Sequence, residues 1–241
     1  KVTINVPGMR SASYYFITTL TDAARYSAAE LADLYRQRWD VELFFRDIKP
    51  FELFRNTVLP RLLAARAAKR TLRIWSAACS TGQEPYSLAI MLKEEFPALA
   101  DRRVEILASD LSSEVLARAR QGKFGQFEVA RGLSQAQLTR FFQRTGTDWQ
   151  LKDEIRCMIQ FSRINLIGSW PKMPPLDIVM LRNVLIYFDV ATKQQILGRV
   201  RELLTPDGYL FLGAAEPPVN LCDSFQRVDF PRAGCYRRGR P

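Results

Sequence analysis

Residues 71–88, TLRIWSAACSTGQEPYSL, constrain the fold of this 241-residue chain more than any other stretch. An apolar run around Ile74 and Trp75 leads into small residues up to Gly82, and a helical pattern follows. This order predicts a strand, a tight turn and a helix N-terminus, the unit on which α/β folds bind nucleotide-like cofactors. The alternative is an ordinary strand–turn–helix of an α/β core, because single short motifs also occur by chance.

The turn does not have the composition of a phosphate-binding loop. It contains neither GxxxxGK[ST] nor GxGxxG, and Glu84 would repel an anion placed over the helix N-terminus. A carboxylate at this position favours a cationic or hydroxyl-bearing ligand. S-adenosylmethionine, which offers an ammonium, a sulfonium and ribose hydroxyls, meets that requirement.

A second apolar strand is predicted over residues 104–111, with a helix starting at Ser112 or Ser113. The strand carries Asp110 near its end, where α/β folds hold the ribose hydroxyls of a cofactor. Asp110 is also a candidate N-cap for the following helix, and the two roles can coexist.

Two more strands and a helix are predicted toward the C-terminus. Residues 176–181 form an apolar run, and residues 209–213 form another. Asp189 is expected to cap the helix between them, and Pro206 and Gly208 to end it. The apolar positions of that helix repeat every three to four residues: Ile196, Leu197, Val200, Leu203 and Leu204.

Five segments together resemble the CheR-type chemotaxis receptor methyltransferases. They are RIWSAACSTGQEPYSL (73–88), SDL (109–111), INL (164–166), RNVLIYF (182–188) and PDGYLFLG (206–213). The resemblance extends from about Phe44 to about Tyr236. It implies an α/β, Rossmann-like methyltransferase fold with a mostly parallel sheet, helices on both faces and a small antiparallel insert at about 142–161.

The resemblance also implies the activity, which is S-adenosylmethionine-dependent methylation of glutamate carboxylates on a chemoreceptor or receptor-like protein. The products are a glutamyl methyl ester and S-adenosylhomocysteine. A glutamate carboxylate with a pKa near ~4.3 is already a nucleophile at pH 7, so the reaction needs no general base. Catalysis then depends mainly on approach and orientation.

Residue roles follow by match to the family. Arg73 and Tyr187 are expected to hold the incoming carboxylate; without the resemblance they would be a surface charge and a core aromatic. Glu84 is expected to accept from the methionine ammonium, and Asp110 from the ribose hydroxyls. The positions expected to bind the cofactor are Arg46, Ala78, Gly82, Glu84, Asp110, Asn165, Leu166, Arg182 and Asn183.

The first part of the chain has a different resemblance. A helix expected over residues 27–49 has the residue spacing of one found in DDE-type insertion-sequence transposases, carried by Tyr35, Arg38, Glu42 and Lys49. A charged amphipathic helix without special meaning is the alternative. We therefore divide the chain into a transposase-like fragment, 1–43, and a methyltransferase domain, 44–241. Because the partner carboxylates of Glu42 are missing, no nuclease chemistry and no metal site are expected.

Composition limits the remaining possibilities. The chain contains no histidine, has no apolar run of the ~20 residues needed for a membrane span, and begins without a signal-like segment. A cytoplasmic protein is therefore expected. Its four cysteines form no CxxC pair and suggest no zinc site: Cys79, Cys157, Cys222 and Cys235.

The basic net charge permits a nucleic-acid, a membrane-surface or an acidic protein partner, and a glutamate-rich receptor would suit a basic enzyme. The net charge is +10, of which residues 1–49 carry +1 (7 basic and 6 acidic side chains) and the rest +9. Because residues 1–49 carry only +1, DNA binding by the transposase-like fragment is not expected. Three functions remain open: an active protein-glutamate methyltransferase, an S-adenosylmethionine-binding remnant without efficient turnover because its docking domain is replaced, and a DNA-binding transposase fragment.

Overall fold

The computed structural model describes residues 2–4, 12–14, 48–66, 70–130, 132–213, 216, 225–230 and 234–239. Before residue 48 it shows two short strands, β1 (Val2–Ile4) and β2 (Ala12–Tyr14), which pair antiparallel. The transposase-like helix around Glu42 and the predicted cofactor residue Arg46 lie outside the described residues.

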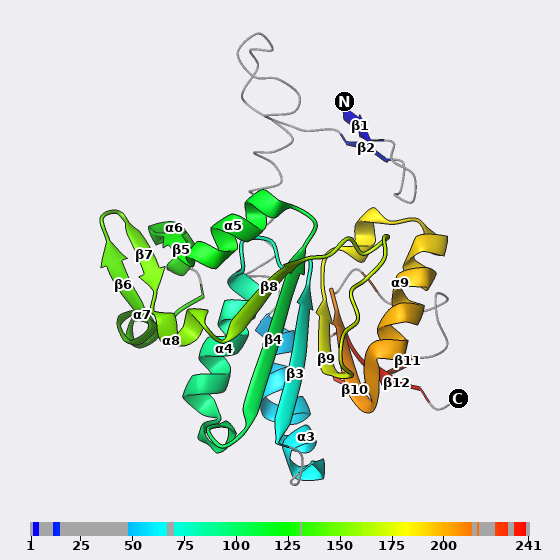
Figure 1. Cartoon of the computed structure of the whole chain (residues 1–241), viewed down its shortest axis with the longest axis horizontal. Helices are drawn as coiled ribbons and strands as arrows, with labels where there is room; N and C mark the ends of the chain where they lie inside the picture. The colour runs from blue at the N-terminus through cyan, green and yellow to red at the C-terminus, as the bar shows by residue number, and fades with distance from the viewer. Residues whose placement is uncertain are drawn as a thin grey trace.

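A seven-stranded sheet forms the centre of the molecule, in the order β11-β12-β10-β9-β3-β4-β8 (Figure 1). The five strands from β10 to β8 are parallel, and β12 and β11 add antiparallel at one edge. The strands are β3 (Thr71–Ala77), β4 (Arg103–Asp110), β8 (Ile159–Arg163), β9 (Leu176–Leu181), β10 (Leu204–Leu212), β11 (Phe225–Arg227) and β12 (Gly234–Arg238).

The order of the strands determines where a ligand can bind. The chain runs from β3 outward to β4 and β8, and then returns to the other side of β3 to form β9 and β10. The direction of winding therefore reverses between β3 and β9. In open α/β sheets, ligands bind beyond the carboxyl ends of the strands at this switch point.

Helices cover both faces of the sheet, as predicted. Along each central strand, alternate residues belong to two different apolar clusters, because successive side chains point to opposite faces. Ile74 and Ile178 pack with the helices from α2 to α5, whereas Trp75 and Val179 pack with α9. The helices are α2 (Ile48–Leu53), η1 (Phe54–Val58), α3 (Leu59–Ala65), α4 (Gln83–Glu95), η2 (Pro97–Leu99), α5 (Ser113–Gln121), η3 (Leu185–Tyr187) and α9 (Val190–Leu203).

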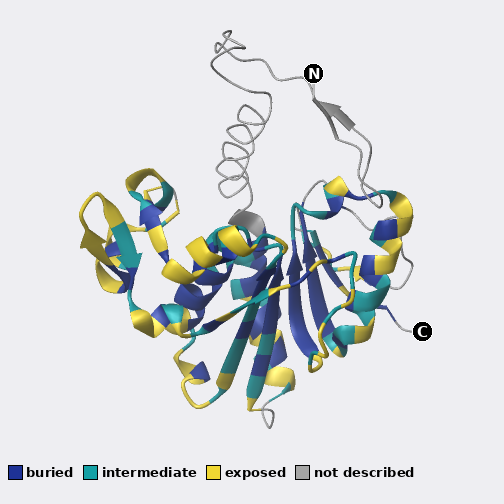
Figure 2. Ribbon diagram, turned by 45° about the horizontal axis from the view of Figure 1, so that its top comes forward, coloured by how far each residue is buried: buried dark blue, intermediate teal, exposed yellow. Residues whose placement is uncertain are grey.

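Burial follows the same layered arrangement. All six residues of β9 are buried, and Figure 2 shows the central strands in dark blue beneath helices whose outer surfaces are exposed. A strand covered on both faces is expected to be mostly apolar, and in LDIVML only Asp177 is polar. Among the described residues, no helix combines the length and the apolar character needed to cross a membrane.

The predicted antiparallel insert is present, with different bounds. It is a three-stranded sheet, β5-β7-β6, that stands to one side of the main sheet with three short helices (Figure 1). The predicted range of 142–161 misses β5 and wrongly includes the start of β8, which pairs with β4 in the main sheet. The insert consists of β5 (Lys123–Gly125), α6 (Gln126–Val129), α7 (Gln135–Phe141), β6 (Phe142–Thr145), β7 (Asp148–Leu151) and α8 (Asp153–Arg156).

Candidate functional site

The loop between β3 and α4 turns sharply because three of its residues have left-handed backbone. Ala78, Ser80 and Gly82 have φ of 56°, 50° and 93°. Such angles cost about 1–2 kcal/mol for a residue with a Cβ, and they concentrate at functional sites. At Gly82 an added Cβ would lie 3.1 Å from Tyr86 Cε2 and 3.2 Å from Ala119 Cβ, so close packing also favours glycine there.

Asp110 is the last residue of β4 and lies beside this loop. Its Oδ2 accepts from the Ser80 N–H at 3.0 Å, and its Oδ1 accepts from the Ser112 N–H at 3.0 Å. The N-cap of α5 is Ser112, whose side chain accepts from the Val115 N–H, so the alternative role of Asp110 as N-cap is wrong. Each carboxylate oxygen keeps free lone-pair capacity, since an ionised carboxylate can accept about four hydrogen bonds.

Glu84, in the first turn of α4, forms a partly buried ion pair across the switch point. Its Oε2 lies 2.9 Å from Nη1 of Arg182, which directly follows β9, and its Oε1 accepts from the Ser76 hydroxyl at 2.8 Å. The Glu84 side chain is only 17% exposed and the Arg182 side chain only 7%. The pair brings a negative and a positive group together at one place on the edge of the sheet.

The segment after β9 carries Asn183 and Tyr187. Asn183 has a left-handed φ of 59°, a conformation that asparagine adopts more readily than most residues. Tyr187 ends the short helix η3 and is 40% exposed. Both residues therefore lie at the carboxyl edge, together with Asp110 and Glu84.

The segment after β8 carries Asn165 and Leu166. Asn165 is exposed, and its Oδ1 accepts from the Ile167 N–H at 3.1 Å. The carbonyl of the buried Leu166 accepts from Trp170 Nε1 at 3.2 Å and from Arg199 Nη1 at 3.3 Å. The Arg199 guanidinium also stacks on the Trp170 ring, 3.9 Å from its centroid, so α9 fixes this segment in place.

Arg73 is not brought to this edge. It is the third residue of β3, opposite Glu105 of β4, and its Nε lies 2.6 Å from Glu105 Oε2. Four residues of strand, roughly 13 Å, separate it from the carboxyl end of β3. The expected role in holding a substrate carboxylate is therefore corrected: Arg73 forms an ion pair near the opposite, amino end of the sheet.

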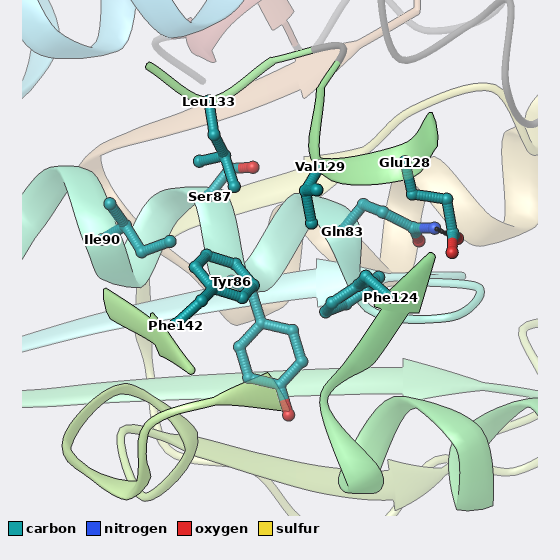
Figure 3. Close-up of a pocket in the computed structure, with 9 residues that line it drawn as sticks. All are labelled: Gln83, Tyr86, Ser87, Ile90, Phe124, Glu128, Val129, Leu133 and Phe142. Carbon is teal, nitrogen blue, oxygen red and sulfur yellow. Dashed lines mark hydrogen bonds between the residues drawn. The ribbon is translucent and has the colours of Figure 1, made fainter. Parts of the chain in front are cut away.

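A small cavity lies on the side of α4 that faces the insert (Figure 3). Its volume is about 30 Å³, which holds about one water molecule and is far too small for a nucleoside. Its walls are mostly apolar: Gln83, Tyr86, Ser87, Ile90, Phe124, Glu128, Val129, Leu133 and Phe142. The cavity therefore belongs to the packing of the insert against α4.

Two features near the edge were missed by sequence reasoning. Glu216, which follows β10, is 5% exposed and accepts backbone N–H groups from the β9 and β10 ends. Arg199 acts on Leu166 from 33 residues away. The acidic residue three positions after Gly213 was a usable signal for Glu216, whereas nothing local marked Arg199. Within the described ranges, no group of three histidine, cysteine, aspartate or glutamate side chains is placed to hold a metal ion.

The chain was compared with protein families. Residues 41–233 match the family model described as CheR methyltransferase, SAM binding domain, and residues 4–76 match one described as Transposase DDE domain. Both resemblances seen in the sequence are thus confirmed. The two matches overlap over residues 41–76.

Curated relatives agree with the first match. Chemotaxis protein methyltransferase 1 of Pseudomonas aeruginosa is 44% identical over 199 residues, which are 81% of this chain and 72% of that protein. Chemotaxis protein methyltransferase Cher2 of Pseudomonas putida is 43% identical over 77% of this chain and 69% of that protein. The chemotaxis protein methyltransferase of Salmonella typhimurium is 38% identical over 86% of this chain and 73% of that protein.

Solved structures are more distant. A TehB-like SAM-dependent methyltransferase from Corynebacterium glutamicum has a TM-score of 0.41 and 15% identity, over 76% of this chain and 72% of that one. An S-adenosylmethionine dependent methyltransferase from Mesorhizobium loti has a TM-score of 0.32 and 20% identity, over 64% of this chain and 51% of that one. The extent of the family match and the identity to the curated relatives place the chain in the CheR family of methyltransferases, whose cofactor is S-adenosylmethionine.

Proposed function

We propose that this protein methylates glutamate side chains of a chemoreceptor or receptor-like protein, giving glutamyl methyl esters. One observation carries the proposal: Asp110, the Glu84–Arg182 pair and Tyr187 meet at the carboxyl edge of a sheet whose winding reverses there. The relatives named as chemotaxis methyltransferases supply the class of substrate.

The Glu84–Arg182 pair fits the amino-acid end of S-adenosylmethionine. That end is a zwitterion, with an ammonium and a carboxylate on one carbon. Glu84 can accept from the ammonium, and Arg182 can donate to the carboxylate through a guanidinium that suits carboxylate geometry. The two charges neutralise each other at 2.9 Å, so neither member of the pair is an isolated buried charge.

Asp110 fits the ribose. Both of its oxygens are oriented by backbone N–H groups at 3.0 Å and retain capacity for two hydroxyl donors. The turn from Ala78 to Gly82 is built from residues with small side chains, which favours close approach of a ligand to its backbone. Asn165 and Leu166 would then lie along the adenine.

Methyl transfer to a carboxylate requires little acid–base catalysis. When bound, S-adenosylmethionine would supply a methyl group carried on a sulfonium. A carboxylate oxygen of the substrate would attack the methyl carbon in line with the carbon–sulfur bond, which breaks to release the thioether. We assign to the Tyr187 hydroxyl, on a 40% exposed side chain, the task of holding the target carboxylate in line with the methyl group. Orientation of this kind supplies several kcal/mol of a barrier.

Cofactor binding tests the first half of the proposal. Asp110→Ala should raise the dissociation constant of S-adenosylhomocysteine about 5- to 150-fold, corresponding to ~1–3 kcal/mol for charge-assisted hydrogen bonds left unmade. Titration calorimetry measures this effect. Asp153→Ala is the matched control, because that carboxylate is 84% exposed and lies in the insert. An unchanged affinity in Asp110→Ala would remove Asp110 from the site.

Methyl transfer tests the second half. With radiolabelled S-adenosylmethionine and a chemoreceptor fragment, the wild-type chain should transfer a label that alkali releases as methanol, as expected for an ester. Tyr187→Phe should lower the turnover number about tenfold or more through lost orientation, without changing the affinity for S-adenosylhomocysteine. A base-stable label would contradict the ester. Normal cofactor binding with no transfer at any receptor concentration would favour the inert remnant.

A further inference from the structure

Glu216 is a buried carboxylate that spans the ends of two strands. Its Oε2 accepts from the Asn183 N–H at 2.6 Å and from the Gly213 N–H at 2.8 Å, and its Oε1 accepts from the Ile186 N–H at 3.1 Å. All three donors are backbone groups. Asn183 and Ile186 belong to the segment after β9, and Gly213 follows β10.

The surroundings of Glu216 are closely packed. A Cβ added at Gly213 would lie 2.3 Å from Asn183 Oδ1 and 2.6 Å from Glu216 Oε2, so only glycine leaves room for this contact. The left-handed φ of 59° at Asn183 occurs at the residue whose N–H Glu216 holds. The bonds from Glu216 therefore oppose relaxation of a backbone conformation that most residues avoid.

We propose that Glu216 is a positioning residue, which fixes the segment 183–187 so that Asn183 meets the cofactor and Tyr187 meets the substrate. The inference rests on the roles proposed above for Asn183 and Tyr187. Glu216 acts through the backbone and touches neither ligand. Three N–H donors require an acceptor at both carboxylate oxygens, and an ionised carboxylate supplies acceptors only.

The energetics agree with such a role. Burial raises the pKa of Glu216, since the charged form loses hydration, and the backbone N–H groups oppose that rise. A carboxylate kept at 5% exposure is costly unless its bonds are all made. In Glu216→Gln, the amide nitrogen would bring a donor against a backbone donor and release part of the segment.

Asp177 provides a matched control on the same sheet. It is fully buried on β9 near the amino end, where its Oδ2 accepts from the Arg73 N–H at 2.8 Å. Asp177→Asn therefore makes the same carboxylate-to-amide change at the opposite edge. Both variants should lower the melting temperature, and only Glu216→Gln should affect ligands.

The experiment is titration calorimetry with S-adenosylhomocysteine, at a temperature at which circular dichroism shows each variant folded. Glu216→Gln should weaken binding about tenfold or more, and Asp177→Asn should stay within about twofold of wild type. At saturating S-adenosylmethionine, the turnover number should fall in Glu216→Gln and persist in Asp177→Asn. Equal losses in both variants, or unchanged binding in Glu216→Gln, would overturn the inference.

A milder variant keeps the test decisive if Glu216→Gln fails to fold. Glu216→Asp retains both acceptor oxygens on a side chain that is one methylene shorter. Its affinity for S-adenosylhomocysteine should therefore be lower than that of wild type but still measurable. Wild-type affinity in Glu216→Asp would then count against the inference. Because calorimetry needs no receptor, a chain that binds the ligand normally but transfers no methyl group would contradict only the proposed function.

Discussion

At the scale of single residues, the left-handed turn after β3 requires a particular residue type, glycine, at position 82. Gly82→Ala should destabilise the fold by about 2–4 kcal/mol, because a φ of 93° is strained for alanine and the new Cβ would lie 3.1 Å from Tyr86 and 3.2 Å from Ala119. Gly146→Ala is the control, with a φ of 63° and nothing within 4 Å of the added Cβ; it should cost about 1 kcal/mol. Urea unfolding measures both, and equal losses would contradict the packing contribution.

The same scale shows which site residues a sequence can reveal. The place of Gly82, Glu84 and Asp110 at the carboxyl edge could be predicted because a strand, a turn and a helix start are local patterns, and these residues lie within them. Arg73 was misplaced because a motif gives order along the chain but not distance along a strand. Glu216 was missed because its partners, up to 33 residues away, become neighbours only when β9 and β10 pair.

At the scale of elements, a cluster of charged groups joins α3 to β9 and β10 at the amino end of the sheet. Arg66, which caps the C-terminus of α3, pairs with Asp177 of β9 and with Asp207 of β10, and its Nη2 lies 2.8 Å from Thr205 Oγ1. The hydrogen bond from Arg66 lowers the pKa of Asp207 below its ordinary value. Folding stability should therefore depend on the charge of this carboxylate.

The sign of that dependence follows from the lowered pKa. An aspartate with a depressed pKa in the folded state stabilises the fold above its unfolded value, about 3.9, and loses this contribution as the pH falls through the folded value. Asp207→Asn should thus be less stable than wild type at pH 7, and the difference should shrink below a pH of about 4. Urea unfolding at several pH values measures it. The control is Glu154→Gln, whose partner Lys93 is 36% exposed, whereas the Arg66 partner of Asp207 is 12% exposed; the more exposed pair should contribute little. A constant difference across the pH range would contradict the prediction.

Elements were easier to predict than their contacts. The strand over 176–181 and the helix capped by Asp189 are present, with the Asp189 side chain accepting from the Thr192 N–H at 2.8 Å. Their apolar periods are encoded locally. The bounds of the insert are not encoded locally. Strand β8 is half polar, and its pairing with β4 depends on a partner about 50 residues earlier in the chain. The Arg66 cluster was likewise hidden, since Asp177 and Asp207 lie 111 and 141 residues from Arg66.

At the scale of the whole molecule, the chain joins two unrelated family resemblances. The transposase match ends at residue 76, inside β3, and the methyltransferase match begins at residue 41. We propose a junction near residue 43, close to the start of the shared stretch. Residues 1–49 carry a net charge of +1, whereas the remainder carries +9. A small basic helical domain, of the kind the family resemblance implies, would attract an acidic receptor, whereas residues 1–49 contribute almost no such attraction.

The nearly neutral charge of residues 1–49 should separate cofactor binding from turnover. Asp110, Glu84, Arg182 and Tyr187 all lie after the junction, so the affinity for S-adenosylhomocysteine should be near that of a family member. Docking normally raises the local concentration of the target helix and fixes its register. Without it, methyl transfer should need far more receptor to reach the same rate. Exchanging residues 1–43 for a small basic helical domain, of the kind the family resemblance implies, should raise transfer at low receptor concentration. The gain should shrink with added salt, because attraction between exposed charges is screened.

A radiolabel assay of both chains over a range of receptor concentrations measures the effect. Equal rates at low receptor concentration would show that docking does not depend on the replaced segment, and a gain insensitive to salt would show that the attraction is not electrostatic.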